Sequence, residues 1–203
     1  MLELPPLSLY IHIPWCVRKC PYCDFNSHRM PERLPEQEYI KALINDLRQE
    51  LDHVQGRKIQ SIFIGGGTPS LFSANSIERI LHEAQLCIGF EADIEITLEA
   101  NPGTAEQQKF ADYQAAGVNR LSIGIQSFND SHLNSLGRIH DGNQARKAID
   151  IAQSAGFNQV NIDLMHGLPN QTIVNSEKDL AIAISSGVTH ISWYQLTLEP
   201  NTE

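Results

Sequence analysis

Three cysteines near the start of the chain are the residues best suited to chemistry. Cys16, Cys20 and Cys23 have the spacing Cys-x3-Cys-x2-Cys. Thiolates are soft ligands that suit zinc and iron–sulfur clusters. The group supplies three ligands, whereas a structural zinc site normally has four protein ligands. The spacing therefore predicts a metal centre with one position left open for another ligand.

Zinc is the alternative interpretation of these cysteines. His12 or His28 would then complete a set of four ligands. The irregular loop that carries the cysteines can instead hold an iron–sulfur cubane with one iron free to take an exogenous ligand. The fourth cysteine, Cys87, falls beside the apolar face of a predicted helix. Packing as a small hydrophobic side chain is favoured over metal ligation there.

Further candidates occur where predicted strands end. Residues 65–69, Gly-Gly-Gly-Thr-Pro, form either a tight turn or a backbone cradle for an anionic or zwitterionic ligand. They lack the Gly-Lys-Ser/Thr ending of a phosphate-binding P-loop. Glu99 and Asp163 occupy otherwise apolar strands, where a carboxylate needs a partner. That partner is either a structural ion pair or a bound amine, hydroxyl or cation. Arg138 is either a solvated surface residue or a ligand contact.

The elements that must position these residues alternate between strand and helix. We predict strands over residues 7–13, 59–64, 93–98, 121–125, 160–164 and 190–198. Helices are predicted over 36–54, around 77–88, over 143–155 and over 173–186, with a further helix from a capping box at Thr104 and Gln107 to Gly117. Residues 28–35 are the one candidate linker. The alternation predicts a parallel sheet with helices packed outside it.

Polar residues after the strands bear on the architecture. The cysteine loop follows the first strand and the glycine run follows the second. The later strand ends carry Glu99 and Asn101, then Gln126 and Ser127, then Asp163 and His166, and finally Gln195 and Glu199. Ligands bind at the carboxyl ends of the strands in barrels and in open doubly wound sheets alike. Six contributing strand ends favour an α/β fold with a partial parallel (β/α)6 barrel around one site.

Composition narrows the functional class. The chain has 203 residues, of which 41% are hydrophobic, enough for one domain with its own core. A net charge of −9 argues against nucleic acid or an anionic membrane surface as the main partner. The N-terminal residues do not resemble a signal peptide, and no apolar run has membrane-spanning length. Clustered cysteines in such a chain indicate reduced metal ligands. We therefore expect a cytoplasmic protein with no integral membrane segment.

Several motifs together resemble the radical S-adenosylmethionine superfamily. The resemblance lies in Tyr10-Ile-His-Ile-Pro-Trp-Cys, the cysteine triplet and the Gly-Gly-Gly-Thr-Pro run. Within the superfamily, the chain is similar to the oxygen-independent coproporphyrinogen III oxidase-like group. That closer similarity lies in Glu-Ala-Asn-Pro at 99–102, Ser-Ile-Gly-Ile-Gln-Ser-Phe at 122–128, Gly-Arg-Ile-His at 137–140 and Asp-Leu-Met-His-Gly-Leu-Pro at 163–169. The resemblance runs from about Leu4 to Asn201, essentially the whole chain.

The resemblance implies cofactors and contact residues. Cys16, Cys20 and Cys23 would hold a 4Fe–4S cluster whose fourth iron binds S-adenosylmethionine. An electron from a donor would then cleave the sulfonium to methionine and a 5′-deoxyadenosyl radical. The residues that match S-adenosylmethionine contacts are Tyr10, Gly66, Glu99, Gln126, Arg138 and Asp163. Tyr22, Gly67 and Thr68 match positions that touch a second S-adenosylmethionine in the oxidase, and whether this chain binds a second one stays open.

One residue departs from the oxidase pattern. The oxidase has a further cysteine two residues after the triplet, where this chain has Phe25. In this respect the chain is similar to the paralogous haem chaperones of the HemW type, which deliver haem to haem-requiring proteins. The resemblance thus implies haem as cargo, with haem-receiving apoproteins and an electron donor as partners. An active coproporphyrinogen oxidase is the alternative, so enzymatic activity stays open. Such proteins normally carry a C-terminal domain, so we expect residues 1–203 to be the core domain of a longer protein.

Overall fold

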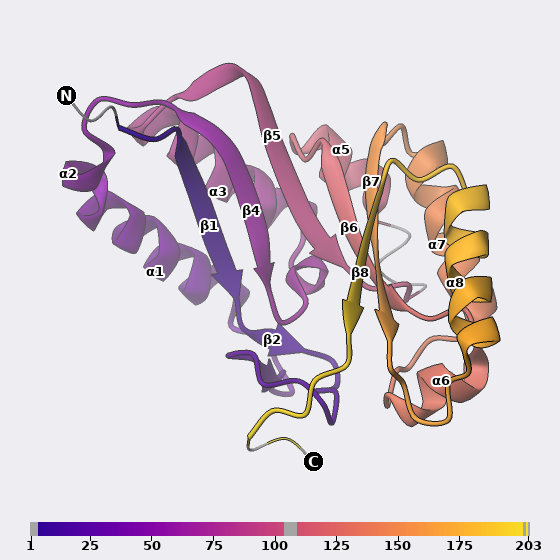
Figure 1. The fold of residues 1–203 in the computed structure, drawn as a ribbon. Coiled ribbons are helices and arrows are strands. Elements are labelled where there is room, and N and C mark those ends of the chain that lie inside the picture. The colour runs from indigo at the N-terminus through magenta and orange to yellow at the C-terminus, as the bar shows by residue number, and fades with distance from the viewer. Residues whose placement is uncertain (1–3, 104–108, 201, 203) are drawn as a thin grey trace.

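Six parallel strands form one curved sheet in the computed structural model, which describes residues 4–103, 109–200 and 202. The strands are β1 (Leu7–Ile13), β4 (Ile59–Gly66), β5 (Phe90–Ala100), β6 (Arg120–Gln126), β7 (Gln159–His166) and β8 (His190–Gln195), and they lie side by side in that order. Every neighbouring pair is parallel, so all carboxyl ends meet at one edge, the lower edge in Figure 1. Within the described chain β1 and β8 do not pair, so the sheet is open on that side.

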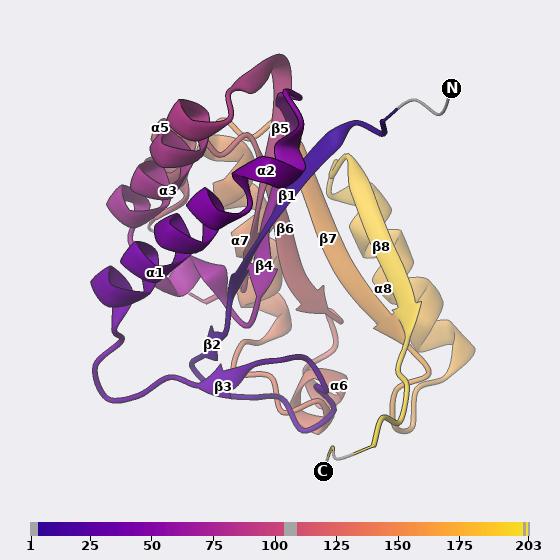
Figure 2. The same ribbon diagram turned by 90° about the vertical axis from the view of Figure 1, so that its left-hand side faces the viewer.

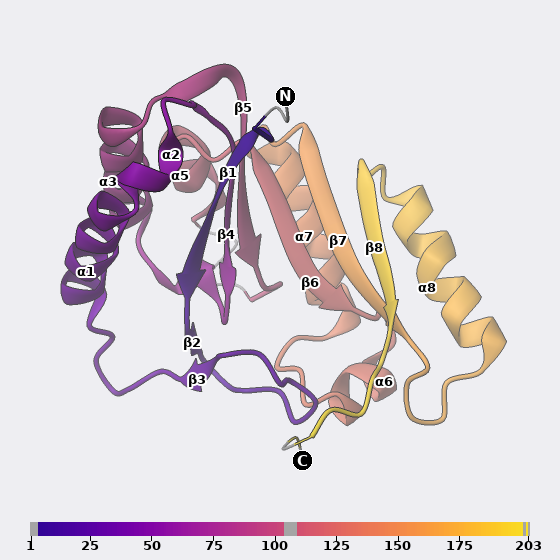
Figure 3. The same cartoon turned by 60° about the vertical axis from the view of Figure 1, so that its left-hand side comes forward.

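The helices lie on the outer face of this sheet. They are α1 (Glu36–Gln49), α2 (Leu51–Val54), α3 (Ala74–Cys87), α5 (Phe110–Ala115), α7 (Gly142–Ser154) and α8 (Ile173–Ser185). Figures 2 and 3 show α1, α3, α5, α7 and α8 outside the curve of the strands, while no helix of the described residues covers the concave face. The predicted α/β fold with a partial parallel barrel is confirmed.

Strand alternation separates the core from the concave face. In β6, Leu121, Ile123 and Ile125 are fully buried. Because successive side chains point to opposite faces, Ser122 and Gln126 face the concave side instead. Burying each of these three apolar side chains contributes about 1.5–3 kcal/mol, so the outer side of β6 adds to the stability of the core. The polar inner face is free for ligand binding.

Short elements complete the carboxyl edge. β2 (Trp15–Cys16) pairs with β3 (His28–Arg29), the 3-10 helix η1 spans Pro69–Leu71, and α6 spans Asp130–Ser135. The sequence did not predict these elements, because each is too short to show a periodic apolar pattern. The cysteine loop runs between β2 and β3, at the lower edge of the sheet in Figure 1.

Several predicted boundaries change. The helix predicted over 36–54 divides at Glu50, whose N–H is shared between the carbonyls of Asp46 and Leu47. β5 begins at Phe90, three residues before the predicted start, and β8 ends at Gln195, before the predicted end at 198. The capping box at Thr104 and Gln107 lies outside the described residues. In the described part of the chain, no helix is long and apolar enough to cross a membrane.

Candidate cofactor site

A cavity of about 430 Å³ lies where the carboxyl ends of the strands meet the cysteine loop. Eleven of the twelve predicted site residues line it: Cys16, Cys20, Cys23, Tyr22, Gly66, Gly67, Thr68, Glu99, Gln126, Arg138 and Asp163. Tyr10 is not part of the lining. Its hydroxyl lies 3.0 Å from His12 Nδ1 and its ring stacks on Phe63. The fold therefore brings residues from β2, the cysteine loop and the ends of four further strands to one place.

The glycine run supports the cysteine loop through its backbone. Gly67 N–H donates to the Ile13 carbonyl at 2.8 Å, and Thr68 N–H donates to the Trp15 carbonyl at 2.7 Å. A Cβ atom on Gly67 would lie 2.6 Å from the Trp15 carbonyl oxygen and 3.0 Å from Cys16 Sγ. Only glycine allows this close approach. Residues 65 and 66 end β4, the chain bends at Gly67 and η1 begins at Pro69, so the run forms one wall of the cavity without closing a tight turn.

The three thiols form a donor set that is compatible with an iron–sulfur cluster. All are free and line the same cavity, but in the described residues no three His, Cys, Asp or Glu side chains are placed to hold one metal ion. Both ring nitrogens of His12 have partners, since Nε2 lies 2.8 Å from the Asn26 carbonyl and Nδ1 lies beside Tyr10. Cluster-binding sulfurs lie farther apart than the ligands of one ion, so this donor set is compatible with an iron–sulfur cluster.

Arg138 lies against the cysteine loop. Its guanidinium donates to Cys20 Sγ at 3.5 Å, to the Gly124 carbonyl at 2.6 Å and to the side-chain oxygen of Asn101. Burial acts to lower the pKa of Arg138, but the neighbouring Tyr22 and Cys20 outweigh it and the pKa is raised. The guanidinium is therefore a fixed positive charge in the cavity, and the alternative of a solvated surface arginine is wrong.

Two carboxyl groups face the cavity. Glu99 accepts a hydrogen bond from Gly66 N–H at 3.1 Å, and Asp163 accepts from Asn161 at 2.9 Å and from Ser122 at 3.3 Å. Burial raises the pKa of Glu99 to about 7, with the Gly66 bond opposing and Asp163 adding to the rise. Burial also raises the pKa of Asp163. Among the described residues neither forms an ion pair, so the structure does not support a structural ion pair. Both remain available to a cationic or hydroxylated ligand.

Gln126 and Tyr194 form one side of the cavity. Gln126 has a φ of +70° at the end of β6, which is uncommon for a residue other than glycine. The Tyr194 hydroxyl donates to Gln126 Oε1 at 2.8 Å, and burial raises the pKa of Tyr194 to about 12. Such an outlier, held by a side chain from another strand, marks a constrained position at a site.

The cavity includes residues that the sequence analysis did not select. Ser122, Gly124, Met165 and Tyr194 line it, as does Asn101, which was noted only as a strand end. Counting by twos along the strands from Gln126 and Asp163 would have selected Ser122, Gly124 and Met165. Tyr194 had no comparable anchor, because no predicted site residue lay on its strand.

The family follows from comparison with known proteins. The model of the family described as "Radical SAM superfamily" matches residues 10–180. The chain belongs to this superfamily. It is 59% identical to heme chaperone HemW of Haemophilus influenzae, over 100% of this chain and 54% of that protein. It is 53% identical to heme chaperone HemW of Escherichia coli, over 100% of this chain and 53% of that protein.

A solved structure has the same fold. Coproporphyrinogen III oxidase (HemN) from Escherichia coli, described as a radical SAM enzyme, superimposes with a TM-score of 0.81 at 31% identity. The match covers 96% of this chain and 45% of that chain. The chain thus spans about half the length of the curated relatives it matches. Membership of the superfamily implies a 4Fe–4S cluster and S-adenosylmethionine as cofactors, and the thiols and polar groups of the cavity are compatible with both.

Proposed function

We propose that residues 1–203 form the core domain of a haem chaperone, which binds haem and delivers it to haem-requiring apoproteins. The observation that carries the proposal is the 59% identity to a heme chaperone over the whole of this chain, against 31% to the oxidase structure. The fold is common to both groups, so the fold alone does not separate delivery of haem from oxidation of a porphyrinogen.

Phe25 supports the same choice. The resemblance places a further cysteine of the oxidase at this position. The Phe25 side chain lines the cavity and is 67% exposed. A phenyl ring ligates no iron, so this chain lacks the extra thiol that the oxidase pattern contains.

The cavity residues have distinct proposed roles. Cys16, Cys20 and Cys23 hold the cluster, which when reduced supplies an electron for cleavage of the S-adenosylmethionine sulfonium bond. Arg138 is a fixed cation suited to the methionine carboxylate of S-adenosylmethionine. Glu99, once ionised, is suited to its ammonium group.

The remaining matched residues complete the S-adenosylmethionine site. Asp163 is suited to accept hydrogen bonds from ribose hydroxyls, and Gln126 lines the cavity beside the proposed ligand, whereas Tyr10 lies outside the cavity lining. Tyr22, Gly67 and Thr68 line the same cavity as the others. Equilibrium dialysis with labelled S-adenosylmethionine measures whether one or two molecules bind.

Haem titration of the anaerobically reconstituted full-length protein, of which residues 1–203 are the core domain, tests the proposal. We expect about four irons and four sulfides per chain, a reduced cluster whose electron paramagnetic resonance spectrum changes with S-adenosylmethionine, and saturable haem binding at one per chain. The chain with Cys16, Cys20 and Cys23 replaced by serine separates haem binding from cluster binding. Failure to bind haem contradicts the proposal. Conversion of coproporphyrinogen III to vinyl product in an anaerobic assay would favour the oxidase, and zinc without iron or sulfide would favour a zinc-stabilised module.

The proposal extends to partners and location. A haem chaperone needs a recipient, and a cluster of this kind needs a one-electron donor. We place both in the cytoplasm, where cysteine thiols stay reduced. Transfer of haem from the loaded chain to an apo-haem enzyme, followed through the enzyme's recovered activity, tests delivery. A loaded chain that retains its haem in the presence of excess apoenzyme would contradict it.

A further inference from the structure

One side chain links two of the three cysteines. Asn101 directly follows β5 and lines the cavity. Its Nδ2 donates to Thr68 Oγ1 at 3.1 Å, and its Oδ1 accepts from Arg138 Nη2. Arg138 in turn donates to Cys20 Sγ, and burial raises the pKa of the Cys16 thiol while Thr68 acts to lower it. Asn101 therefore hydrogen-bonds two side chains, each of which interacts with a different cysteine.

The partners determine which way the amide points. A guanidinium has only donors, so the oxygen of Asn101 must face Arg138 and its NH₂ must face Thr68. Thr68 Oγ1 then accepts from Asn101, which leaves the hydroxyl proton of Thr68 to be donated to Cys16. An aspartate at this position would accept from both neighbours. The Thr68 hydroxyl would then turn towards the carboxylate and away from the sulfur. Only an amide orients both neighbours as donors to sulfur.

The surroundings keep the amide in this position. A Cβ atom on Gly124 would lie 3.3 Å from Asn101 Oδ1 and 3.4 Å from Arg138 Nη2, so glycine lets both groups lie against the β6 backbone. Thr68 is buried, and its N–H is held by the Trp15 carbonyl. The side chains of Thr68 and Arg138 are thus held in place by backbone contacts as well as by Asn101.

We propose that Asn101 is a positioning residue that raises the reduction potential of the cluster held by Cys16, Cys20 and Cys23. The inference rests on the proposed function only for the presence of that cluster. Hydrogen bonds to cluster sulfurs tune the potential, as does net charge nearby. Reduction adds negative charge, which a donated hydrogen bond and a guanidinium both stabilise. Asn101 holds a hydrogen-bond donor, the Thr68 hydroxyl, and a positive charge, the Arg138 guanidinium, in place beside the cysteines.

A potentiometric titration of the reconstituted chain, monitored by electron paramagnetic resonance, tests this role. We expect Asn101→Asp and Asn101→Ala both to lower the potential. The aspartate variant should show the larger shift, because it reverses the Thr68 bond and offsets the charge of Arg138. Asn119→Ala is the matched control: the Asn119 side chain bonds the Ile96 N–H and the Ile94 carbonyl, away from the cysteines. This control should lose stability and keep the wild-type potential.

The outcomes separate this inference from the proposed function. An unchanged potential in Asn101→Asp with wild-type iron content overturns the role of Asn101, whatever the haem titration gives. A lowered potential in the Asn101 variants, together with failure of the full-length protein to bind haem, supports the role of Asn101 and contradicts the chaperone. If neither Asn101 variant retains iron, Thr68→Val is measured instead, because it removes only the Thr68 hydroxyl. A lowered potential there supports the inference, and an unchanged one overturns it.

Discussion

The carboxylate of Glu99 accepts a hydrogen bond from the backbone N–H of Gly66 at 3.1 Å, which ties the end of β5 to the glycine run after β4. Gly65 lets the carboxylate come this close, since a Cβ atom there would lie 3.1 Å from Glu99 Oε2. The carboxyl group is therefore held in the cavity at the expense of its hydration. The protonation state of Glu99 and the backbone conformation at Gly66 therefore depend on one another.

This relationship predicts a pH dependence of stability. The pKa of Glu99 rises from an ordinary value of 4.5 to about 7 on folding. The folded chain therefore binds the proton more tightly than the unfolded chain. The stabilising effect is complete below pH 4.5 and is lost as the pH rises to about 7. We expect Glu99→Gln to be more stable than the wild type at pH 8, by on the order of 3 kcal/mol at most.

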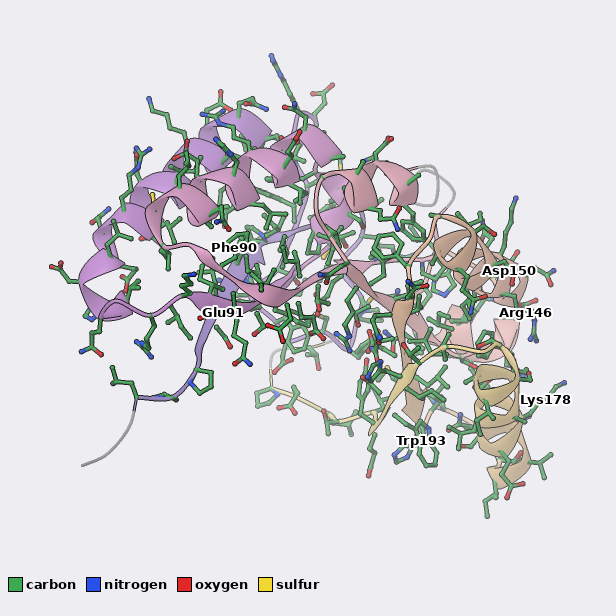
Figure 4. The ribbon with its side chains drawn as sticks, turned by 90° about the horizontal axis from the view of Figure 1, so that it is seen from above. Phe90, Glu91, Arg146, Asp150, Lys178 and Trp193 are labelled. Atoms are coloured by element: carbon green, nitrogen blue, oxygen red, sulfur yellow. The ribbon has the colours of Figure 1, made fainter. Side chains whose placement is uncertain are left out.

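Urea denaturation followed by circular dichroism at pH 5 and pH 8 measures the effect. Asp163 has a raised pKa for the same reason, so part of the slope should remain in Glu99→Gln. Glu91 lies on the same strand, is exposed at the start of β5 and is labelled in Figure 4, so Glu91→Gln is the control. Equal pH slopes in the wild type and Glu99→Gln would contradict the prediction.

Replacing Gly67 should disrupt the cysteine loop. The alanine Cβ would collide with the Trp15 carbonyl oxygen at 2.6 Å and press on Cys16 Sγ at 3.0 Å, so β2 must move. We expect Gly67→Ala to lower the iron content after reconstitution several-fold, measured by iron and sulfide analysis. In Gly56→Ala the new Cβ meets nothing within 4 Å, but φ is +74°. That control should lose about 1 kcal/mol of stability and keep its iron. Wild-type iron content in Gly67→Ala would contradict the expectation.

The sequence predicts the fold well because the strands and helices differ clearly in period. Buried runs such as 121–125 and helices with a single apolar stripe mark a parallel α/β sheet, and six polar strand ends indicate a ring around one site. The elements missed, β2, β3, η1 and α6, carry too few residues for any period to be visible. Their positions depend on tertiary hydrogen bonds that sequence patterns do not reveal.

Which site residues the sequence could predict depended on motifs. Glu99 was selected because a carboxylate in an apolar strand needs a partner, the resemblance to a known family assigned ligand contacts to Glu99 and Arg138, and both line the cavity. Asn101 and Tyr194 act through contacts across the sheet, to Arg138 and to Gln126. Such pairings join residues 37 and 68 positions apart, and no local pattern encodes them.

Asp179 anchors the loop that follows β6. It is buried in α8, and its carboxylate accepts from Ser127 Oγ at 2.6 Å and from Phe128 N–H at 2.9 Å. Removing the acceptor leaves buried donors unsatisfied, so Asp179→Ala should cost about 2–4 kcal/mol of stability. Thermal unfolding measures the loss.

Two exposed charged residues provide control variants for the Asp179 prediction. Asp150 on α7 and Lys178 on α8 are exposed and are labelled in Figure 4. Asp150→Ala and Lys178→Ala should change stability by less than about 0.5 kcal/mol. A loss in Asp179→Ala no larger than in these controls would show that the loop is held by other contacts.

Tyr194 should contribute to S-adenosylmethionine binding through Gln126. Its hydroxyl donates to Gln126 Oε1 at 2.8 Å and so fixes the side-chain amide of Gln126. Gln126 is the last residue of β6 and has a left-handed backbone conformation. Tyr194→Phe keeps the ring and removes this bond, which is worth about 1 kcal/mol. We expect S-adenosylmethionine to bind roughly five-fold more weakly, measured by isothermal titration calorimetry of the reconstituted chain. Trp193, labelled in Figure 4, lies on the other face of β8. Its ring packs against the His166 ring, with the two ring centroids 4.6 Å apart. Trp193→Phe should therefore bind S-adenosylmethionine as the wild type does, and an equal loss in both variants would mean that β8 acts only as a structural support.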